Sequence, residues 1–247
     1  TWEKYDPTIP WVGPTPERAL KVRKALNLAV NRQAIIDHVL IGEAGPLLAT
    51  WGFRPGDPWS DPAWKPYPYD PKKAKELLAE AGYPNGFELE MILVVMPGRA
   101  EAPDIGKAVA MDWEKIGVKV KLTAGEYATH IRPQIAKRTH GRQVYPYSTS
   151  PREPVDQFGK YGHSGAALIL GDEHPELDQA IARASLEVDF KKRAELNRQI
   201  GQLYYENYWA VPIASSNLLW AVSKKVGEWS ITPGLTYIHN YEYVQPA

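Results

Sequence analysis

The stretch FELEMILVVM, residues 87–96, decides the fold. Its first half alternates polar and apolar residues and its second half is continuously apolar, as expected of a β-strand that is covered on both faces. A segment with apolar residues at helical spacing follows, Gly117 closes it, and residues 118–123 (VKVKLT) alternate again. Strand, helix and strand in this order form a right-handed crossover between parallel strands. The sequence therefore predicts an α/β sheet with helices on its faces.

Cap residues and apolar spacing predict further helices around this unit. Thr15, Asn31 and Asp70 each precede a run with apolar residues at helical spacing. The remaining elements predicted are a short helix at 126–138, a short third strand at 143–147, a polar loop at 148–165, helices at 175–186 and after Asp189, and strand-like segments at 211–214 and 218–222.

Residues 45–69 form a long segment without helical or alternating period. The segment holds six prolines together with Trp51, Trp59 and Trp64. Loops longer than about 12–15 residues inside a domain tend to be functional. The alternative is a rigid connector whose aromatic rings pack inward.

Composition excludes several classes of function. Lys and Arg together number 29, as do Asp and Glu, so the zero net charge offers no overall field for nucleic acid or an anionic membrane. Any partner must then be recognised by local chemistry, and nucleic acid is not expected. The longest apolar run, 91–96, is too short for a transmembrane helix. No leader is recognisable at Thr1, which leaves a cytosolic protein or a leader outside this sequence.

Neither metal, cofactor nor enzyme chemistry is expected. Cysteine is absent, and the six histidines show no spacing typical of metal ligands. The sequence also holds no nucleophile elbow, Walker loop or dinucleotide-binding glycine pattern. These observations favour a binding protein over an enzyme.

Ligands of open parallel sheets bind where loops leave the carboxyl ends of the strands. The three loops of this kind carry guanidinium groups, aromatic rings and hydroxyls, which suit anionic groups, sugars and amides. The predicted ligand-binding residues are Arg99 after the first strand, Tyr127 after the second, and Tyr147, Ser148, Thr149, Ser150 and Arg152 after the third. The alternative is a surface ion pair of either arginine with its neighbouring glutamate, Glu101 or Glu153.

Several stretches resemble the family 5 extracellular solute-binding proteins of bacterial ABC importers. The resemblance covers most of residues 21–213 in the family's order. It rests on KVRKALNLAVNRQAII from Lys21, YDPKKAKELLAEAGYPNGFELEM from Tyr69, DWEKIGVKVKL from Asp112, HPELDQAIARA from His174 and DFKKRAELNRQIGQLYYENYWAVPI from Asp189.

This resemblance implies a two-lobed protein that closes over its ligand, of which this chain is the carboxyl-terminal half. Residues 1–14 would be a connector at the hinge and 15–207 a periplasmic-binding-protein-like second lobe, with a mixed sheet flanked by helices. Residues 208–247 would be a strand-rich segment returning to the first lobe. The implied partners are a small-molecule solute, the missing amino-terminal lobe and a membrane-embedded ABC permease. The implied location is periplasmic or at the cell surface.

The resemblance also assigns roles to predicted site residues. Arg99 lies where peptide-binding members hold the ligand carboxylate, and Tyr127 lies where a Trp is usual. Ser150 stands where the family has an Asp that holds the peptide amine, and a hydroxyl cannot give that charge-assisted bond. An opine, a sugar-like solute or an anionic molecule is therefore favoured over ordinary peptides. The alternatives are an interaction module that binds protein or polysaccharide through the Trp-rich loop 45–69, and a hydrolase.

Overall fold

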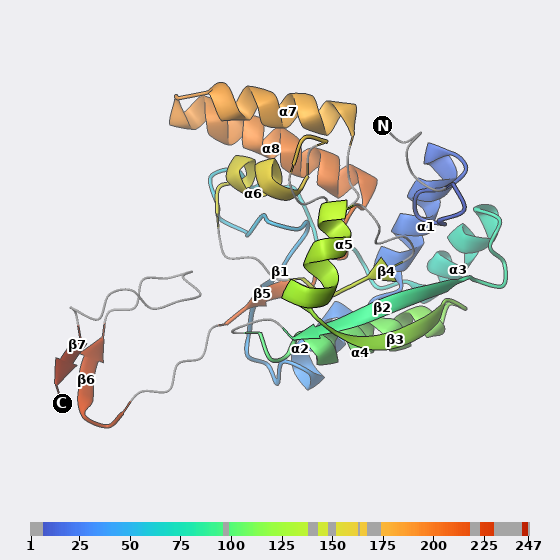
Figure 1. Ribbon diagram of the computed structural model, residues 1–247, viewed down its shortest axis with the longest axis horizontal. Helices are drawn as coiled ribbons and strands as arrows, with labels where there is room; N and C mark the ends of the chain where they lie inside the picture. Colours follow the sequence, from blue (N-terminus) through green and yellow to red (C-terminus); the bar gives the residue numbers. More distant parts are fainter. Residues whose placement is uncertain are drawn as a thin grey trace.

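The centre of the computed structural model is a three-stranded parallel sheet in the order β3-β2-β4. The strands are β2 (Glu88–Val95), β3 (Lys119–Glu126) and β4 (Gln143–Val144) (Figure 1). The prediction of a strand, helix and strand unit with parallel strands is thus confirmed. The structure describes residues 7–95, 99–137, 143–147, 152–162, 164–166, 174–217, 223–229 and 244–246.

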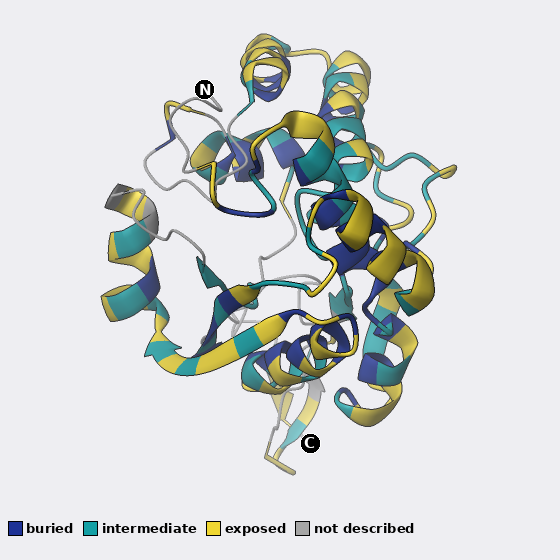
Figure 2. Cartoon of the chain, turned by 90° about the vertical axis from the view of Figure 1, so that its right-hand side faces the viewer, coloured by how far each residue is buried: buried dark blue, intermediate teal, exposed yellow. Residues whose placement is uncertain are grey.

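Helices cover both faces of this sheet. On one face, β2 side chains such as Leu89 and Met91 join a core with α1 (Pro16–Leu28), α3 (Pro71–Glu80) and α4 (Ala102–Glu114). On the other face, Ile92 and Val94 pack against Ile131 of the helical segment that follows β3. Figure 2 shows the buried residues on the inward sides of the helices and the exposed ones on their outer sides. Because β2 is buried from both sides, its apolar run is continuous.

The expected caps are confirmed. The side chain of Thr15 accepts a hydrogen bond from the Arg18 N–H at the start of α1, and Asp70 does the same for α3. The side chain of Asn31 likewise caps α2 (Arg32–His38). These side chains satisfy N–H groups that the first helical turn leaves without partners.

The segment between β3 and β4 differs from the prediction. Strand β3 continues to Glu126, three residues beyond the expected end, because its parallel pairing with β2 continues as far as Val95. The helix expected at 126–138 begins one residue later as a π-helical turn, η2 (Tyr127–Ile131), and continues as α5 (Arg132–Lys137). Strand β4 is shorter than the predicted 143–147.

A second layer of helices packs around its own apolar core. It consists of α6 (Pro154–Tyr161), α7 (Pro175–Leu186) and α8 (Phe190–Asn207). The bounds of α7 match the prediction. The polar loop expected at 148–165 was wrong, because α6 lies within it and its Phe158 is fully buried against this core.

The Trp-rich segment 45–69 is mainly a packed connector. It begins with a short strand, β1 (Ala44–Leu47), which pairs antiparallel with β5 (Ala214–Ser216). Its three tryptophans then pack against the core of the second helical layer. The strand expected at 211–214 begins only at Ala214 in the structure. The segment 218–222, expected as a strand, lies outside the described residues.

A separate antiparallel pair is formed by β6 (Val226–Trp229) and β7 (Val244–Pro246). Figure 1 shows it apart from the main sheet and the helices. None of the helices in the described ranges is both long and apolar enough to cross a membrane.

Candidate functional site at the carboxyl edge of the sheet

The loops that carry the predicted site residues leave one edge of the sheet. Val95 at the end of β2 pairs with Glu126 at the end of β3, so the chain leaves both strands at the same level. Tyr127 follows β3 directly, and Arg99 comes four residues after the end of β2. Residues of α4 and of the helical segment after β3 pack on opposite faces of the sheet, which is the arrangement that opens a ligand crevice in α/β proteins.

The residues after β4 run along the same edge. Val144 pairs with Met91, and residues 145–147 follow β4 directly. Pro146 lies near Gly106 of α4, whereas Tyr145 packs with Ile92 and Val94 on the opposite face. The ring of Tyr147 contacts those of Tyr145 and Tyr127, which both pack with Ile92 and Val94, so Tyr147 lies on this same side.

Tyr147 is the centre of an aromatic cluster. Its ring centroid lies 5.9 Å from that of Trp51 and 6.0 Å from that of Tyr161. The centroids of Tyr127 and Tyr145 are each 6.1 Å away. We call these five residues the Tyr147 cluster. The structure thus brings the predicted residues Tyr127 and Tyr147 together.

The phenols of Tyr147 and Tyr127 remain neutral over the physiological pH range. Burial raises the pKa of Tyr147 far above its ordinary value, and a hydrogen bond with the Tyr161 hydroxyl raises it further. Burial also raises the pKa of Tyr127. A neutral phenol both donates and accepts hydrogen bonds, so Tyr147 and Tyr127 offer apolar ring surface with uncharged polar tips.

Arg99 lies in a buried position at this edge, with 9% of its surface exposed. The N–H of Ala102, in the first turn of α4, donates a 3.3 Å hydrogen bond to the Arg99 carbonyl oxygen. The residue is thereby placed between the end of β2 and the start of α4. Buried guanidinium groups are suited to holding a carboxylate or phosphate through paired hydrogen bonds.

Arg152 has a different environment. Its Nη1 lies 3.4 Å from Oδ2 of Asp156, and both side chains are about half exposed. Arg152 therefore forms a surface ion pair, but with Asp156 and not with the expected Glu153. Glu153 instead accepts hydrogen bonds from Arg193 and Asn197. Ser148, Thr149 and Ser150 lie outside the described residues.

Two members of the Tyr147 cluster, Trp51 and Tyr161, were not predicted as site residues. Tyr161 is three residues after Phe158, which is a helical spacing, but this single pair is too weak a signal to predict α6 within a polar segment. Trp51 belongs to the Trp-rich segment, and its position beside Tyr147 depends on contacts with Phe158 and Tyr204 that are distant in sequence.

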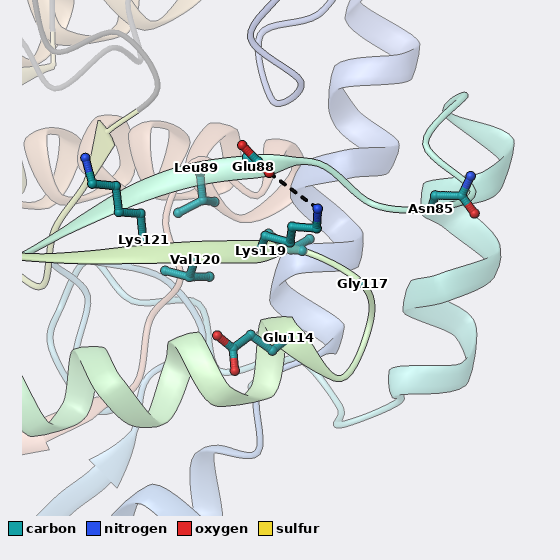
Figure 3. A pocket seen from close by; sticks show the side chains of 9 residues that line it. Asn85, Glu88, Leu89, Glu114, Gly117, Lys119, Val120 and Lys121 are labelled. Atoms are coloured by element: carbon teal, nitrogen blue, oxygen red, sulfur yellow. Dashed lines mark hydrogen bonds and ion pairs between the residues drawn. The ribbon is translucent and has the colours of Figure 1, made fainter.

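A depression of about 650 Å³ lies at the opposite, amino-terminal edge of the sheet (Figure 3). It is lined by charged residues at the starts of β2 and β3, including Glu88 and Lys119, which form an exposed ion pair of 3.4 Å. Exposed ion pairs of this kind contribute little to stability. Because the depression lies at the starts of the strands, it is separate from the predicted site at their ends. Among the described residues, no group of His, Asp or Glu side chains could hold a metal ion.

Comparisons with known proteins agree with the fold and the resemblance. The family model for the middle region of bacterial extracellular solute-binding proteins, family 5, matches residues 13–167. Di/tripeptide-binding protein 1 of Pseudomonas aeruginosa is 33% identical over 88% of this chain and 41% of its own length. Heme-binding protein A of Haemophilus influenzae is 33% identical over 80% of this chain and 36% of its own length.

The fold matches that of solved relatives. The crystal structure of a dipeptide-binding protein from a Pseudoalteromonas species superposes with a TM-score of 0.75, at 24% identity, over 92% of this chain and 45% of that one. The chain spans about two fifths of the length of the curated relatives that it matches. The matched family model and the identity to curated relatives together show that the chain belongs to the family 5 bacterial extracellular solute-binding proteins.

Proposed function

We propose that this chain forms one lobe of a two-lobed protein that captures a small polar solute for an ABC-type importer. Family membership and the partial coverage of the relatives support this proposal. In this arrangement residues 1–14 are a connector, 15–207 the second lobe and 208–247 a segment of the first lobe. The protein would act outside the cytoplasm, in the periplasm or at the cell surface, and would deliver its solute to a membrane-embedded permease.

The observation that carries the proposal is the common edge from which Arg99, Tyr127 and Tyr147 leave the sheet. A lobe that forms one side of a ligand cleft needs such an edge, because the ligand must contact several loops of that lobe at once. When the other lobe closes over the ligand, the solute is removed from water. The ligand drives closure to the extent that it binds the closed form more tightly than the open form.

The proposed contacts follow from the chemistry of the residues. Arg99 anchors an anionic group, Tyr127 and Tyr147 wall the site, and Ser148, Thr149, Ser150 and Arg152 supply polar contacts. The solute is a peptide, an opine or a sugar-like molecule. With the hydroxyl of Ser150 in place of a carboxylate, a solute without a free α-ammonium group is favoured. The two curated relatives are named for di- and tripeptides and for heme, so the family accommodates different ligands.

The alternative function, an interaction module that uses the Trp-rich loop, is not supported. Trp51, Trp59 and Trp64 pack against the core of α6, α7 and α8. Trp64 also donates a 2.7 Å hydrogen bond from its indole nitrogen to Gln202 of α8. Rings engaged in this way stabilise the fold and offer little surface to a partner.

A thermal-shift screen of the complete protein tests the proposal. The panel contains opines, amino acids, oligosaccharides and di- and tripeptides. A solute at 100 times its dissociation constant stabilises the folded protein by about 2.7 kcal/mol, which raises the melting temperature by several degrees. A protein that no member of the panel stabilises would contradict the proposed solute classes.

A further inference from the structure

The turn between α7 and α8 exposes three large apolar side chains within five residues. Leu186 is 83% exposed, Val188 90% and Phe190 51%. Turns of this kind usually carry Gly, Asn, Asp or Ser, and large apolar residues are usually buried. A group of exposed apolar side chains on a soluble domain marks a surface that meets another molecule or a membrane.

These side chains lie on a turn whose backbone is extended. Glu187 (φ −81°, ψ 124°) and Asp189 (φ −73°, ψ 121°) are both extended. The three apolar residues therefore lie on a short extended connection between the two helices, with Glu187 and Asp189 between them.

Both carboxylates are engaged with the backbone. Glu187 Oε1 accepts a 2.8 Å hydrogen bond from the Asp189 N–H, and Asp189 Oδ1 accepts one of 2.9 Å from the Lys192 N–H. These bonds keep the two negative groups close to the main chain.

Arg193 connects the backbone of the turn to the residue before α6 by hydrogen bonds. Its Nη1 donates to the carbonyl oxygens of Glu187 (3.1 Å) and Val188 (3.4 Å). Its Nε donates a 2.6 Å hydrogen bond to Glu153, just before α6, and the guanidinium lies against the ring of Phe190. Because these hydrogen bonds hold the backbone of the turn in one conformation, the turn loses little conformational entropy when it contacts another surface.

Three exposed basic side chains lie next to the turn, beside the acidic Glu187 and Asp189 within it. Arg183, Lys191 and Lys192 are exposed, and within the described ranges none of them forms an ion pair. The chain as a whole has no net charge, so this is a local feature. Figure 1 shows the turn at an outer end of the α7–α8 pair, where no other labelled element covers it.

We propose that the α7–α8 turn is a membrane-contact site, which places Leu186, Val188 and Phe190 in the interface of an anionic bilayer. Apolar side chains bind the boundary between headgroups and acyl chains, and adjacent Lys and Arg side chains bind anionic headgroups. Both components are present here, and the carboxylates of Glu187 and Asp189 are held by hydrogen bonds to the main chain. This site does not depend on the solute site, and it would hold a solute carrier close to its importer.

Vesicle co-sedimentation of the complete protein, without solute, tests this inference. The vesicles contain phosphatidylcholine with about one third phosphatidylglycerol, or phosphatidylcholine alone. We expect binding to the anionic vesicles, and the triple variant Leu186→Ser, Val188→Ser, Phe190→Ser should weaken it by about tenfold or more. The double variant Lys191→Gln, Lys192→Gln should reduce binding toward the level seen with neutral vesicles. The control is Met111→Gln, which changes a 62% exposed apolar residue on α4 and should leave binding unchanged.

Two results would overturn the inference. One is the absence of vesicle binding by the unaltered protein, and the other is binding that the triple variant leaves unchanged. If the triple variant impairs transport in cells while vesicle binding is unaffected, the turn contacts a protein and the lipid assignment is wrong. Melting temperatures of all variants check that they fold. Because the assay contains no solute, its outcome is independent of the proposed solute site.

Discussion

The guanidinium of Arg32 donates a 2.6 Å hydrogen bond from Nε to the carbonyl oxygen of Pro212, 180 residues later in the chain. The same group donates to the main-chain and side-chain oxygens of Asn27, and Asn27 donates in turn to the carbonyl oxygen of Ala210. Burial lowers the pKa of Arg32 to about 10, so it is still charged at neutral pH. These bonds fix the segment that leaves α8 against the first two helices.

Replacing Arg32 by Met should destabilise the fold. The change keeps much of the side-chain volume but leaves the Pro212 and Asn27 oxygens buried without their donor, so we expect the free energy of unfolding to fall by about 3 kcal/mol. Urea unfolding followed by tryptophan fluorescence measures this. The control Arg183→Met removes an exposed side chain that bonds only within its own helix, and should change stability by less than about 0.5 kcal/mol. Equal effects would refute the role of Arg32.

Gly201 of α8 is required by the close approach of the Trp-rich segment. A Cβ atom there would overlap the ring of Trp64 and lie 2.8 Å from the ring of Phe53. We expect Gly201→Ala to reduce stability by about 2 kcal/mol, because the rings are held by their own contacts. Gly159 of α6 has no atom within 4 Å of the same position, so Gly159→Ala should stabilise by about 0.5–1 kcal/mol. Thermal unfolding of both variants gives the comparison, and a destabilised Gly159→Ala or a neutral Gly201→Ala contradicts it.

The elements that could be predicted from the sequence are those specified by local signals. Thr15 and Asp70 cap their helices through residues three positions away, and the apolar run of β2 is visible within ten residues. Helix α6 could not be predicted in this way. Its polar residues resemble a loop, and its burial depends on Phe158 meeting Phe53, Ile200 and Tyr204 from other parts of the chain.

The same distinction applies to the candidate site. Tyr127 and Tyr147 could be predicted, because the carboxyl ends of parallel strands share an edge wherever the sheet forms. Trp51 and Tyr161 could not, because their places beside Tyr147 require the Trp-rich segment and α6 to be docked first. Distant packing, which no local pattern encodes, completes the cluster.

Glu90 joins all three strands of the main sheet and should contribute pH-dependent stability. Thr123 of β3 and Gln143 of β4 donate hydrogen bonds of 2.7 and 2.8 Å to its carboxylate, and these bonds lower the pKa of Glu90. A carboxyl whose pKa is lower in the folded than in the unfolded state stabilises the fold above the unfolded pKa. That contribution disappears as the pH falls through the folded value.

The variant Glu90→Gln should therefore be less stable than the unaltered protein by about 1 kcal/mol near pH 7, and the difference should shrink toward pH ~2.5. Urea unfolding at both pH values measures it. Glu88→Gln is the matched control, because Glu88 is on the same strand and, among the described residues, pairs only with the exposed Lys119. A difference that persists unchanged at low pH would show that the charge of Glu90 is not the cause.

Asn197 of α8 should hold the start of α6 in place. It is fully buried, its Oδ1 accepts a 2.8 Å hydrogen bond from the Val155 N–H, and its Nδ2 donates one of 2.7 Å to Glu153. We expect Asn197→Ala to cost about 2 kcal/mol and to speed hydrogen exchange in α6 more than in α7. The control Gln199→Ala changes an exposed residue on the same helix. Uniform exchange across both helices would mean that Asn197 stabilises the whole layer and does not cap α6.

Arg99 provides the sharpest test of the solute site. If its guanidinium binds an anionic group of the solute, Arg99→Ala should weaken binding by roughly 1.5–3 kcal/mol, which is about 10- to 150-fold. Titration calorimetry of the complete protein with the best solute of the screen measures this. Arg99→Lys keeps the charge but loses the two parallel hydrogen bonds, so its affinity should be intermediate. Arg54→Ala removes an arginine that is paired with Asp57 outside the site and should leave affinity unchanged. Equal affinities for the Arg99→Ala and Arg54→Ala variants, both folded, would exclude Arg99 as the anchor, and the anionic group of the solute would then need another partner.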